Sequence, residues 1–248
     1  MDVKTLKGAI KDIEAVVFDK DGTLVGGINL WKKIFSYQMK AAEELGLNIK
    51  EIASKIFGAS DALAYSPLVT FHASEAPILM ATAIWLVYKL PWFKCKEYGE
   101  KIIESGAKMI SKEELYEPLP YAIPAIEFFS KIVPVCIATS DSRENTIEMI
   151  KYLNLKNKIK CIVTSDEVKN GKPDADILLR ISELLATDTQ KILSVGDNEI
   201  DVETAKRAGA KSIIVGEEDL GADGWVRDLG ELITLNKGKK NNGQENYN

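Results

Sequence analysis

Asp19-Lys20-Asp21-Gly22-Thr23 follows directly on the apolar run Ala15-Val16-Val17-Phe18. A short apolar run bounded by Gly and Asp is typical of a buried strand that ends in a turn. Two carboxylates, two residues apart, are therefore predicted at the C-terminal tip of a strand, the edge where open α/β sheets bind ligands. One carboxylate could attack phosphorus while the other handles the proton of the leaving group. The alternative is an Asp-Gly turn on the surface.

Three later segments carry polar residues at comparable places. They are Val135-Cys136-Ile137-Ala138 followed by Thr139-Ser140, the loop Gly171-Lys172-Pro173, and Ile192-Leu193-Ser194-Val195 followed by Gly196-Asp197, with Asp201 four residues on. Each segment alone has an ordinary explanation. Strands often end in Thr or Ser, most lysines are solvated, and an acid in the first turn of a helix is favoured by the helix dipole.

Phosphoryl transfer requires residues of these types. It depends mainly on positioning and charge neutralisation. A carboxylate nucleophile repels a phosphate dianion, and Mg²⁺, which prefers oxygen ligands, removes that repulsion. A lysine such as Lys172 offsets charge on the remaining oxygens, and Gly22 allows backbone N–H groups to point at the phosphate. The four segments together therefore favour a phosphoryl-transfer site.

The four segments also resemble, in this order, the phosphatase branch of the haloacid dehalogenase superfamily. The resemblance implies that Asp19 is the nucleophile that forms an aspartyl-phosphate and that Asp21 is the general acid and base. Thr139 and Lys172 would bind the phosphoryl oxygens. Mg²⁺ would be held by Asp19, the backbone carbonyl of Asp21, and Asp197. Asp201 would complete the metal site by orienting Lys172 or a metal-bound water.

Further candidates for binding the substrate are Ser140 and Arg143, which follow closely on Thr139. For Arg143, a salt bridge with Glu144 or Glu148 on a helix surface is an equal alternative. His72, the only histidine, could contact a leaving group, but a hydrogen-bonded structural role is the stronger expectation for it.

Asp21 distinguishes between branches of the superfamily. Cation-pumping ATPases carry Thr at this position and dehalogenases lack an Asp there, so Asp21 favours a phosphatase.

The chain departs in two places from relatives that resemble phosphoglycolate phosphatase or β-phosphoglucomutase. Lys20 replaces the usual apolar residue between the two aspartates, and Val25-Gly26-Gly27 stands where those relatives often have Asp with Ser or Thr.

The expected fold is α/β, because strands and helices alternate along most of the chain. Strands are predicted at about 14–19, 133–138, 160–164, 191–195 and 211–215, and helices at about 122–131, 143–153, 174–186 and 200–209. The resemblance implies a Rossmann-like three-layer α/β/α core with a parallel sheet in the order 3-2-1-4-5. Its catalytic core is predicted over residues 1–27 and 118–235.

Helical periodicity replaces this alternation between Thr23 and Pro118. Residues 28–117 are therefore predicted to form a helical cap, inserted after the first strand, which closes over the site. Its most apolar stretch, 76–90, is too short to span a bilayer, and we expect a buried helix there. Trp85, Trp92 and Phe93 are expected in the core. Residues 236–248 are almost free of apolar side chains, which predicts a disordered tail.

Composition limits the class of partner. The chain has 248 residues and a net charge of −5, and it lacks the basic stripe of a nucleic-acid binder. Three scattered cysteines and the absence of an apolar signal segment near the N-terminus fit a cytoplasmic protein. We expect no membrane partner and a monomer or homodimer.

The sequence thus predicts a Mg²⁺-dependent, phosphoglycolate phosphatase-like enzyme that hydrolyses small phosphorylated metabolites. Two alternatives stay open. One is a sugar phosphomutase of the same superfamily, and the other is a non-catalytic relative that binds a metabolite or a protein.

Overall fold

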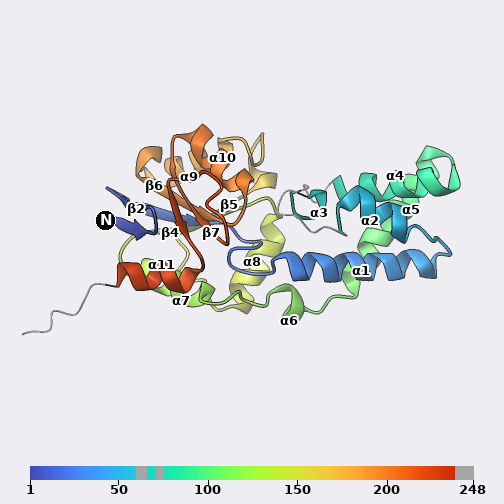
Figure 1. Cartoon of the computed structure of the whole chain (residues 1–248), viewed down its shortest axis with the longest axis horizontal. Helices are drawn as coiled ribbons and strands as arrows, with labels where there is room; N and C mark the ends of the chain where they lie inside the picture. Colours follow the sequence, from blue (N-terminus) through green and yellow to red (C-terminus); the bar gives the residue numbers. More distant parts are fainter. Residues whose placement is uncertain (60–65, 71–74, 238–248) are drawn as a thin grey trace, which may run out of the picture.

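A parallel sheet lies at the left of Figure 1, and the helices of the insert extend from it to the right. The computed structural model describes residues 1–59, 66–70 and 75–237. The sheet has six strands in the order β5-β4-β3-β6-β7-β8, and every pairing within it is parallel. The strands are β3 (Ala15–Phe18), β4 (Val135–Thr139), β5 (Cys161–Thr164), β6 (Ile192–Gly196), β7 (Lys211–Val215) and β8 (Gly224–Val226). The predicted order 3-2-1-4-5 is confirmed, and β8 extends it by one edge strand.

The sheet is covered by helices on both faces, because β3 is apolar on both of its sides. Val16 and Phe18 pack into one core cluster with α7, α8 and α11, whereas Ala15 and Val17 pack into another with α9 and α10. These helices are α7 (Ala122–Phe129), α8 (Arg143–Tyr152), α9 (Asp176–Leu185), α10 (Glu199–Ala208) and α11 (Leu229–Asn236). The predicted three-layer α/β/α architecture is therefore confirmed.

The predicted strands and helices of the core do not include β1, β2, β8 or α11. A small antiparallel hairpin, β1 (Val3–Thr5) with β2 (Gly8–Ile10), precedes β3 in the chain, and the edge strand β8 and helix α11 follow β7. The prediction that disorder begins at Asn236 is wrong for that residue. Asn236 is the last residue of α11, and its side chain exchanges hydrogen bonds with the backbone of Lys4 at 2.8 and 3.0 Å. Residues 238–248 lie outside the described residues.

Within the described residues, six helices lie between Gly27 and Pro118, where the sequence predicts a cap. They are α1 (Ile28–Glu44), α2 (Lys50–Phe57), α3 (Pro67–Thr70), α4 (Ala76–Tyr88), α5 (Trp92–Lys108) and α6 (Lys112–Leu115). Helices α1, α2, α4 and α5 share an apolar cluster of their own, which includes Phe35, Phe57 and Ile102. Figure 1 shows these helices extending to one side of the sheet.

The chain leaves and re-enters the sheet region at neighbouring points. Val25 forms an antiparallel bridge with Pro118, and Leu119 N donates to Leu24 O at 2.9 Å. Helix α1 starts after Gly27, whose φ is +86°. The exact boundaries of a core and a cap stay a prediction.

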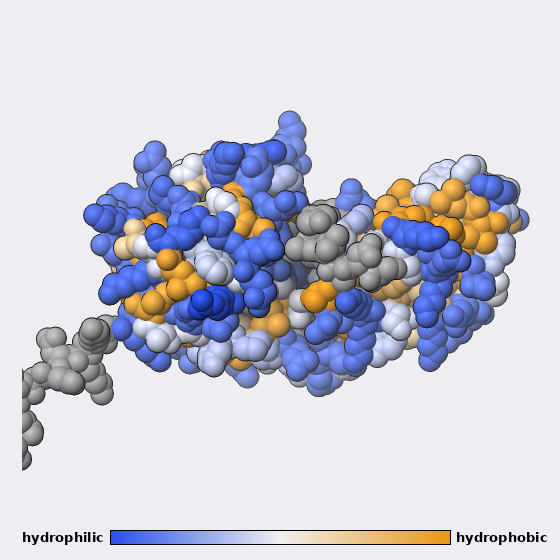
Figure 2. Space-filling view, in the orientation of Figure 1, coloured by the Kyte–Doolittle hydropathy of each residue, from blue (hydrophilic) through white to orange (hydrophobic). Residues whose placement is uncertain are grey.

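The expectation of a buried helix over 76–90 is wrong for one side of α4. Met80 and Ile84 are fully buried, but Trp85 is 43% exposed. The reason is that α4 packs against α2 and α5, which cover only part of its surface. Trp92 and Phe93, at the start of α5, are 44 and 57% exposed, so the expectation of these aromatics in the core is wrong as well. Figure 2 shows apolar residues gathered at the end of the insert where α4 and α5 meet. No helix in the described ranges combines the length and apolar character needed to cross a bilayer.

Candidate active site

The candidate site lies at the carboxyl ends of β3, β4 and β6, which are neighbours in the sheet. Asp19 follows β3, Thr139 ends β4, and Asp197 follows β6. Parallel strands present their carboxyl ends at one edge, so these residues meet although they are far apart in sequence. Lys172 comes from the loop before α9, and Asp201 from the first turn of α10.

Lys172 links two of the predicted aspartates. Its Nζ lies 2.6 Å from Asp19 Oδ1 and 2.6 Å from Asp201 Oδ1. The lysine side chain is only 5% exposed. Burial alone lowers the pKa of Lys172, but the two carboxylates outweigh it and hold this pKa above its usual value. Lys172 is thus a buried, permanently charged group beside the predicted nucleophile.

Asp19, Asp197 and Asp201 form an acidic cluster, with one oxygen from each within 4.8 Å of the others. Burial raises the pKa of Asp19 to about 7, against the opposing effect of Lys172. Burial, and then the charges of Asp201 and Asp19, also raise the pKa of Asp197 well above its usual value. Three carboxylates lie around one lysine here, so the cluster would carry excess negative charge once all three are ionised. Its hard oxygen donors are compatible with a divalent metal ion.

Two glycines make this close packing possible. A Cβ on Gly22 would lie 2.1 Å from Asp197 Oδ2, and the φ of Gly22 is +91°. A Cβ on Gly196 would lie 2.2 Å from Asp201 Oδ2. Any side chain at these positions would displace a carboxylate of the cluster. The Gly in each strand-tip turn is therefore required by the site itself.

Asn198 fixes the start of α10 and with it Asp201. Its Oδ1 accepts hydrogen bonds from the backbone N–H groups of Ile200 and Asp201, as a helix N-cap does. Asp201 Oδ2 accepts from Asp197 N at 3.2 Å, and Asp201 Oδ1 faces Lys172. The carboxylate of Asp201 is therefore engaged on both oxygens, which is more than helix-dipole stabilisation requires.

Asp21 does not join the acidic cluster with its side chain. Its Oδ1 lies 2.7 Å from Lys20 Nζ, and Lys20 Nζ also lies 2.9 Å from Asp141 Oδ2. Burial raises the pKa of Asp21, and Lys20 is the largest opposing influence. Sequence reasoning missed Lys20 and Asp141 as members of the site. The available signal was the lysine itself, since a cation inside a buried turn requires anionic partners.

The remaining predicted residues differ in their placement. Thr139 is buried, and its Oγ1 accepts from Asp141 N at 3.1 Å. Ser140 O accepts from Ser165 Oγ at 2.7 Å. Arg143 has its guanidinium 2.7 Å from Glu167 and bonded to Ile162 O, so the structure does not bring it to the acidic cluster. A salt bridge was one expectation for Arg143, but its partner is neither Glu144 nor Glu148. His72 lies outside the described residues.

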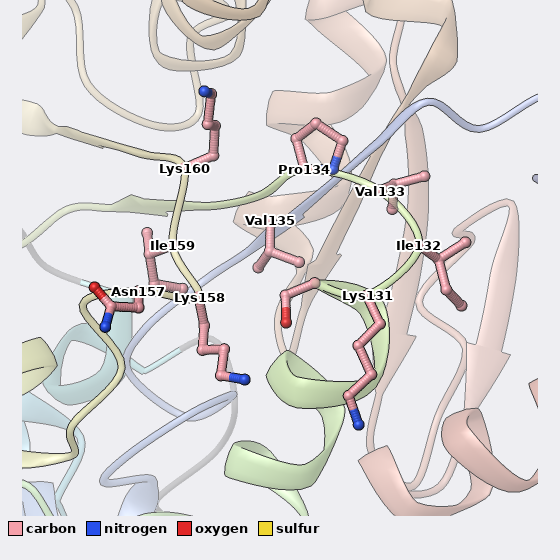
Figure 3. Close-up of a pocket in the computed structure, with 10 residues that line it drawn as sticks. Lys131, Ile132, Val133, Pro134, Val135, Asn157, Lys158, Ile159 and Lys160 are labelled. Atoms are coloured by element: carbon pink, nitrogen blue, oxygen red, sulfur yellow. The ribbon is translucent and has the colours of Figure 1, made fainter.

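A hollow in the surface lies away from this site (Figure 3). Its lining comes from residues 130–135 and 157–160, which precede β4 and β5. It therefore sits at the amino ends of these strands, opposite the acidic cluster, and shares no residue with it.

Comparison with known proteins identifies the family. Residues 16–215 match the family model of the haloacid dehalogenase-like hydrolases. The chain therefore belongs to the haloacid dehalogenase-like hydrolase family, as the resemblance implied, and is an enzyme of that superfamily.

Named relatives agree with this assignment. The chain is 32% identical to a phosphorylated carbohydrates phosphatase from Thermotoga maritima over 203 residues, which cover 81% of this chain and 84% of the relative. It is 26% identical over 237 residues to a phosphoglycolate phosphatase from Chromobacterium violaceum, covering 92% of this chain and 98% of that one. Among solved structures, a putative β-phosphoglucomutase from Thermotoga maritima is 26% identical with a TM-score of 0.64, covering 90% of this chain and 98% of that one.

Proposed function

We propose that this protein is a Mg²⁺-dependent phosphatase that hydrolyses small phosphomonoester metabolites through an aspartyl-phosphate on Asp19. The observation that carries the proposal is the position of Lys172 Nζ, 2.6 Å from both Asp19 and Asp201, with Asp197 in the same cluster. A nucleophilic carboxylate, a fixed positive charge and an oxygen-rich cation site thus occupy one strand edge. Phosphoryl transfer needs this combination of positioning and charge.

The first chemical step transfers the phosphoryl group to the enzyme. A carboxylate oxygen of Asp19 forms a bond to phosphorus as the bond from phosphorus to the leaving oxygen breaks. Asp21 gives its proton to the leaving oxygen, so the product departs as an alcohol. Lys172, and Thr139 at the end of β4, would bind the phosphoryl oxygens.

The second step restores the enzyme. Asp21, now a carboxylate, takes a proton from a water molecule as the water oxygen bonds to phosphorus. The bond between phosphorus and Asp19 breaks, inorganic phosphate leaves, and Asp21 is again protonated. The raised pKa of Asp21 supports a role that requires both protonation states.

The proposed metal would be held by Asp19, Asp197 and the backbone carbonyl of Asp21, with Asp201 completing the site. The excess negative charge of the acidic cluster supports a divalent cation there. When bound, Mg²⁺ would offset the repulsion between the Asp19 carboxylate and the phosphate.

The substrate class rests on the relatives and on the insert. The relative that is 32% identical is named for phosphorylated carbohydrates, and another for phosphoglycolate. Residues 28–117 would act as a cap over a core formed by 1–27 and 118–235. A closing cap suits small diffusible esters, because it leaves little room for a protein or nucleic acid. A cytoplasmic monomer or homodimer without a membrane partner stays our prediction.

The test is phosphate release from a panel of esters, with Mg²⁺ and with EDTA. The panel contains phosphoglycolate, sugar phosphates, nucleoside monophosphates and p-nitrophenyl phosphate. We expect release that needs Mg²⁺ and differs among the esters. A folded protein that releases no phosphate from any of them would contradict the proposal.

A sugar phosphomutase is the second candidate, and the similarity to a putative β-phosphoglucomutase favours it. A mutase would interconvert phosphate positions on a sugar and release little phosphate, which phosphorus NMR of the sugar phosphates distinguishes. Metabolite binding without either reaction would favour a non-catalytic relative.

A further inference from the structure

Lys20 is a buried lysine placed between two aspartates. The residue is 3% exposed, and its Nζ lies 2.7 Å from Asp21 Oδ1 and 2.9 Å from Asp141 Oδ2. A lysine is almost never buried to this degree unless it is paired. Lys20 is also the residue that departs from the apolar position expected between the two motif aspartates.

Asp141 ties this lysine to the start of α8. Its Oδ1 accepts hydrogen bonds from Ser142 N at 2.7 Å and from Asn145 Nδ2 at 3.0 Å. Ser142 is the N-cap of α8, so the Asp141 carboxylate is fixed to the end of a helix. Its other oxygen, Oδ2, remains for Lys20. The contacts therefore run from α8 through Asp141 and Lys20 to Asp21.

The same contacts determine which oxygen of Asp21 is free. Within the part of the chain that the structure describes, Lys20 occupies Oδ1 and no hydrogen bond engages Oδ2, so Oδ2 is the oxygen left to exchange a proton with a substrate. The Asp21 side chain is 22% exposed, compared with 4% for Lys20. Asp21 is thus open on one side and held by a charge-assisted hydrogen bond on the other.

We propose that Lys20, anchored by Asp141, is a positioning residue that holds Asp21 with Oδ2 directed at the leaving oxygen. The proposal rests on the function proposed above, because it assigns how the general acid of that reaction is aimed. The two lysines then have separate partners: Lys172 pairs with the nucleophile Asp19, and Lys20 pairs with the general acid Asp21.

A purely structural Lys20 would have a different signature. If the lysine only joined the turn after β3 to α8, its loss would lower stability and slow every substrate by a similar factor. If it aims Asp21, the loss must depend on how much the leaving group needs a proton. A good leaving group departs without protonation, whereas a poor one does not.

The experiment compares p-nitrophenyl phosphate, a good leaving group, with phenyl phosphate, a poorer one, in the full chain with Mg²⁺. For Lys20→Met we expect kcat/KM to fall roughly 100-fold for phenyl phosphate, at the low end of general-acid effects, and less than about 10-fold for p-nitrophenyl phosphate. Lys20→Arg should recover part of the loss, since it keeps the charge. Lys191→Met is the control, because Lys191 is an exposed lysine paired with Glu14 at the amino end of β6.

A second variant tests the proposal if Lys20→Met fails to fold. Lys20→Met leaves two partly buried carboxylates without their cation, and adding Asp141→Asn removes one of those charges while keeping an acceptor for Ser142 N. If the double variant folds and still discriminates between the two esters, the proposal stands. Equal losses for both esters, in either folded variant, overturn it while the phosphatase stands. No hydrolysis by the unaltered protein overturns both.

Discussion

Lys172 Nζ lies 2.6 Å from Asp19 Oδ1 and reaches it across 153 residues of sequence. The two residues come from different loops, yet each is the other's partner in a buried ion pair. Removing either member therefore has a different consequence for the folded protein. Loss of the acid relieves negative charge in the cluster, whereas loss of the lysine leaves that charge uncompensated.

Asp19→Asn should reduce the rate of phosphate release by at least about 1,000-fold, because an amide cannot act as the nucleophile. The protein should stay folded, since Lys172 keeps Asp201 as a partner. Steady-state assays and circular dichroism measure the two effects. Asp12→Asn is the matched control, an exposed aspartate that should tolerate the change. Near-normal turnover in Asp19→Asn would exclude the covalent mechanism.

Lys172→Met should destabilise the metal-free protein by about 3–5 kcal/mol, the usual result of removing one partner from a buried ion pair. The acidic cluster then has no cation of its own. Denaturant unfolding with EDTA gives the free energy directly. The control is Lys211→Met, which removes a partly exposed lysine 3.4 Å from Asp223, with 45% of its side chain accessible, and should change stability by less than about 1 kcal/mol. A similar small change in Lys172→Met would mean that the cluster is more solvated than its burial indicates.

The stabilisation that Asp19 contributes to the metal-free protein should be lost as pH rises from about 4 to about 7. The pKa of Asp19 is raised from 3.8 to about 7, so the folded state holds this proton where the unfolded state has lost it. Stabilisation from this group is complete below the lower pKa and is lost as pH rises through the upper one. Thermal unfolding of the protein and of Asp19→Asn, both in EDTA, isolates the contribution. An identical pH slope in the two proteins would contradict the assignment.

Mg²⁺ should raise the unfolding temperature, and the rise should be larger at pH 8 than at pH 5. A cation that binds only the folded state stabilises it, and it binds ionised carboxylates better than protonated ones. Asp19 and Asp197 both have raised pKa values, so we expect protons to compete with Mg²⁺ for these two carboxylates. Differential scanning fluorimetry over a Mg²⁺ series measures the effect. A shift that does not depend on pH would argue for a cation site elsewhere.

Gly22→Ala should weaken Mg²⁺ binding and lower activity, because the new Cβ would lie 2.1 Å from Asp197 Oδ2. The positive φ of Gly22 adds backbone strain of about 1–2 kcal/mol. Gly46→Ala separates the two effects. Gly46 also has a positive φ, +75°, but a Cβ there meets nothing within 4 Å. Both variants should lose stability, and only Gly22→Ala should lose metal affinity in a calorimetric titration.

The parallel sheet was predictable because its strands are short apolar runs that end at polar residues. Val16 and Val17 face opposite helical layers, so the run shows no alternation and reads as a fully buried strand. The hairpin of β1 and β2 was missed because each strand has only three residues, and β1 (Val-Lys-Thr) and β2 (Gly-Ala-Ile) lack the longer apolar run that predicts a strand. Helix α11 was missed in part because its C-terminal end adjoins a polar segment almost free of apolar residues.

The site was predictable where chemistry and strand tips coincide, as at Asp19, Asp197 and Lys172. The ion-pair partner of a long side chain was not predictable where several acids lie within its reach. Arg143 pairs with Glu167, which lies 24 residues away and is brought near by β5. Trp92 is exposed although its apolar neighbourhood favoured the core, because hydropathy does not show which face of a helix lacks a neighbour.

The bridge between Val25 and Pro118 has an evolutionary consequence. The described helices between Gly27 and Pro118, α1 to α6, are connected to the rest of the chain at two neighbouring points, so the pairing of the sheet strands involves none of their residues. A different insert could be joined there without disturbing the strand tips that carry Asp19 and Asp197. If the insert acts as the proposed cap, its sequence and the strand tips can change independently in related proteins, so substrate preference can diverge while the chemistry at Asp19 is kept.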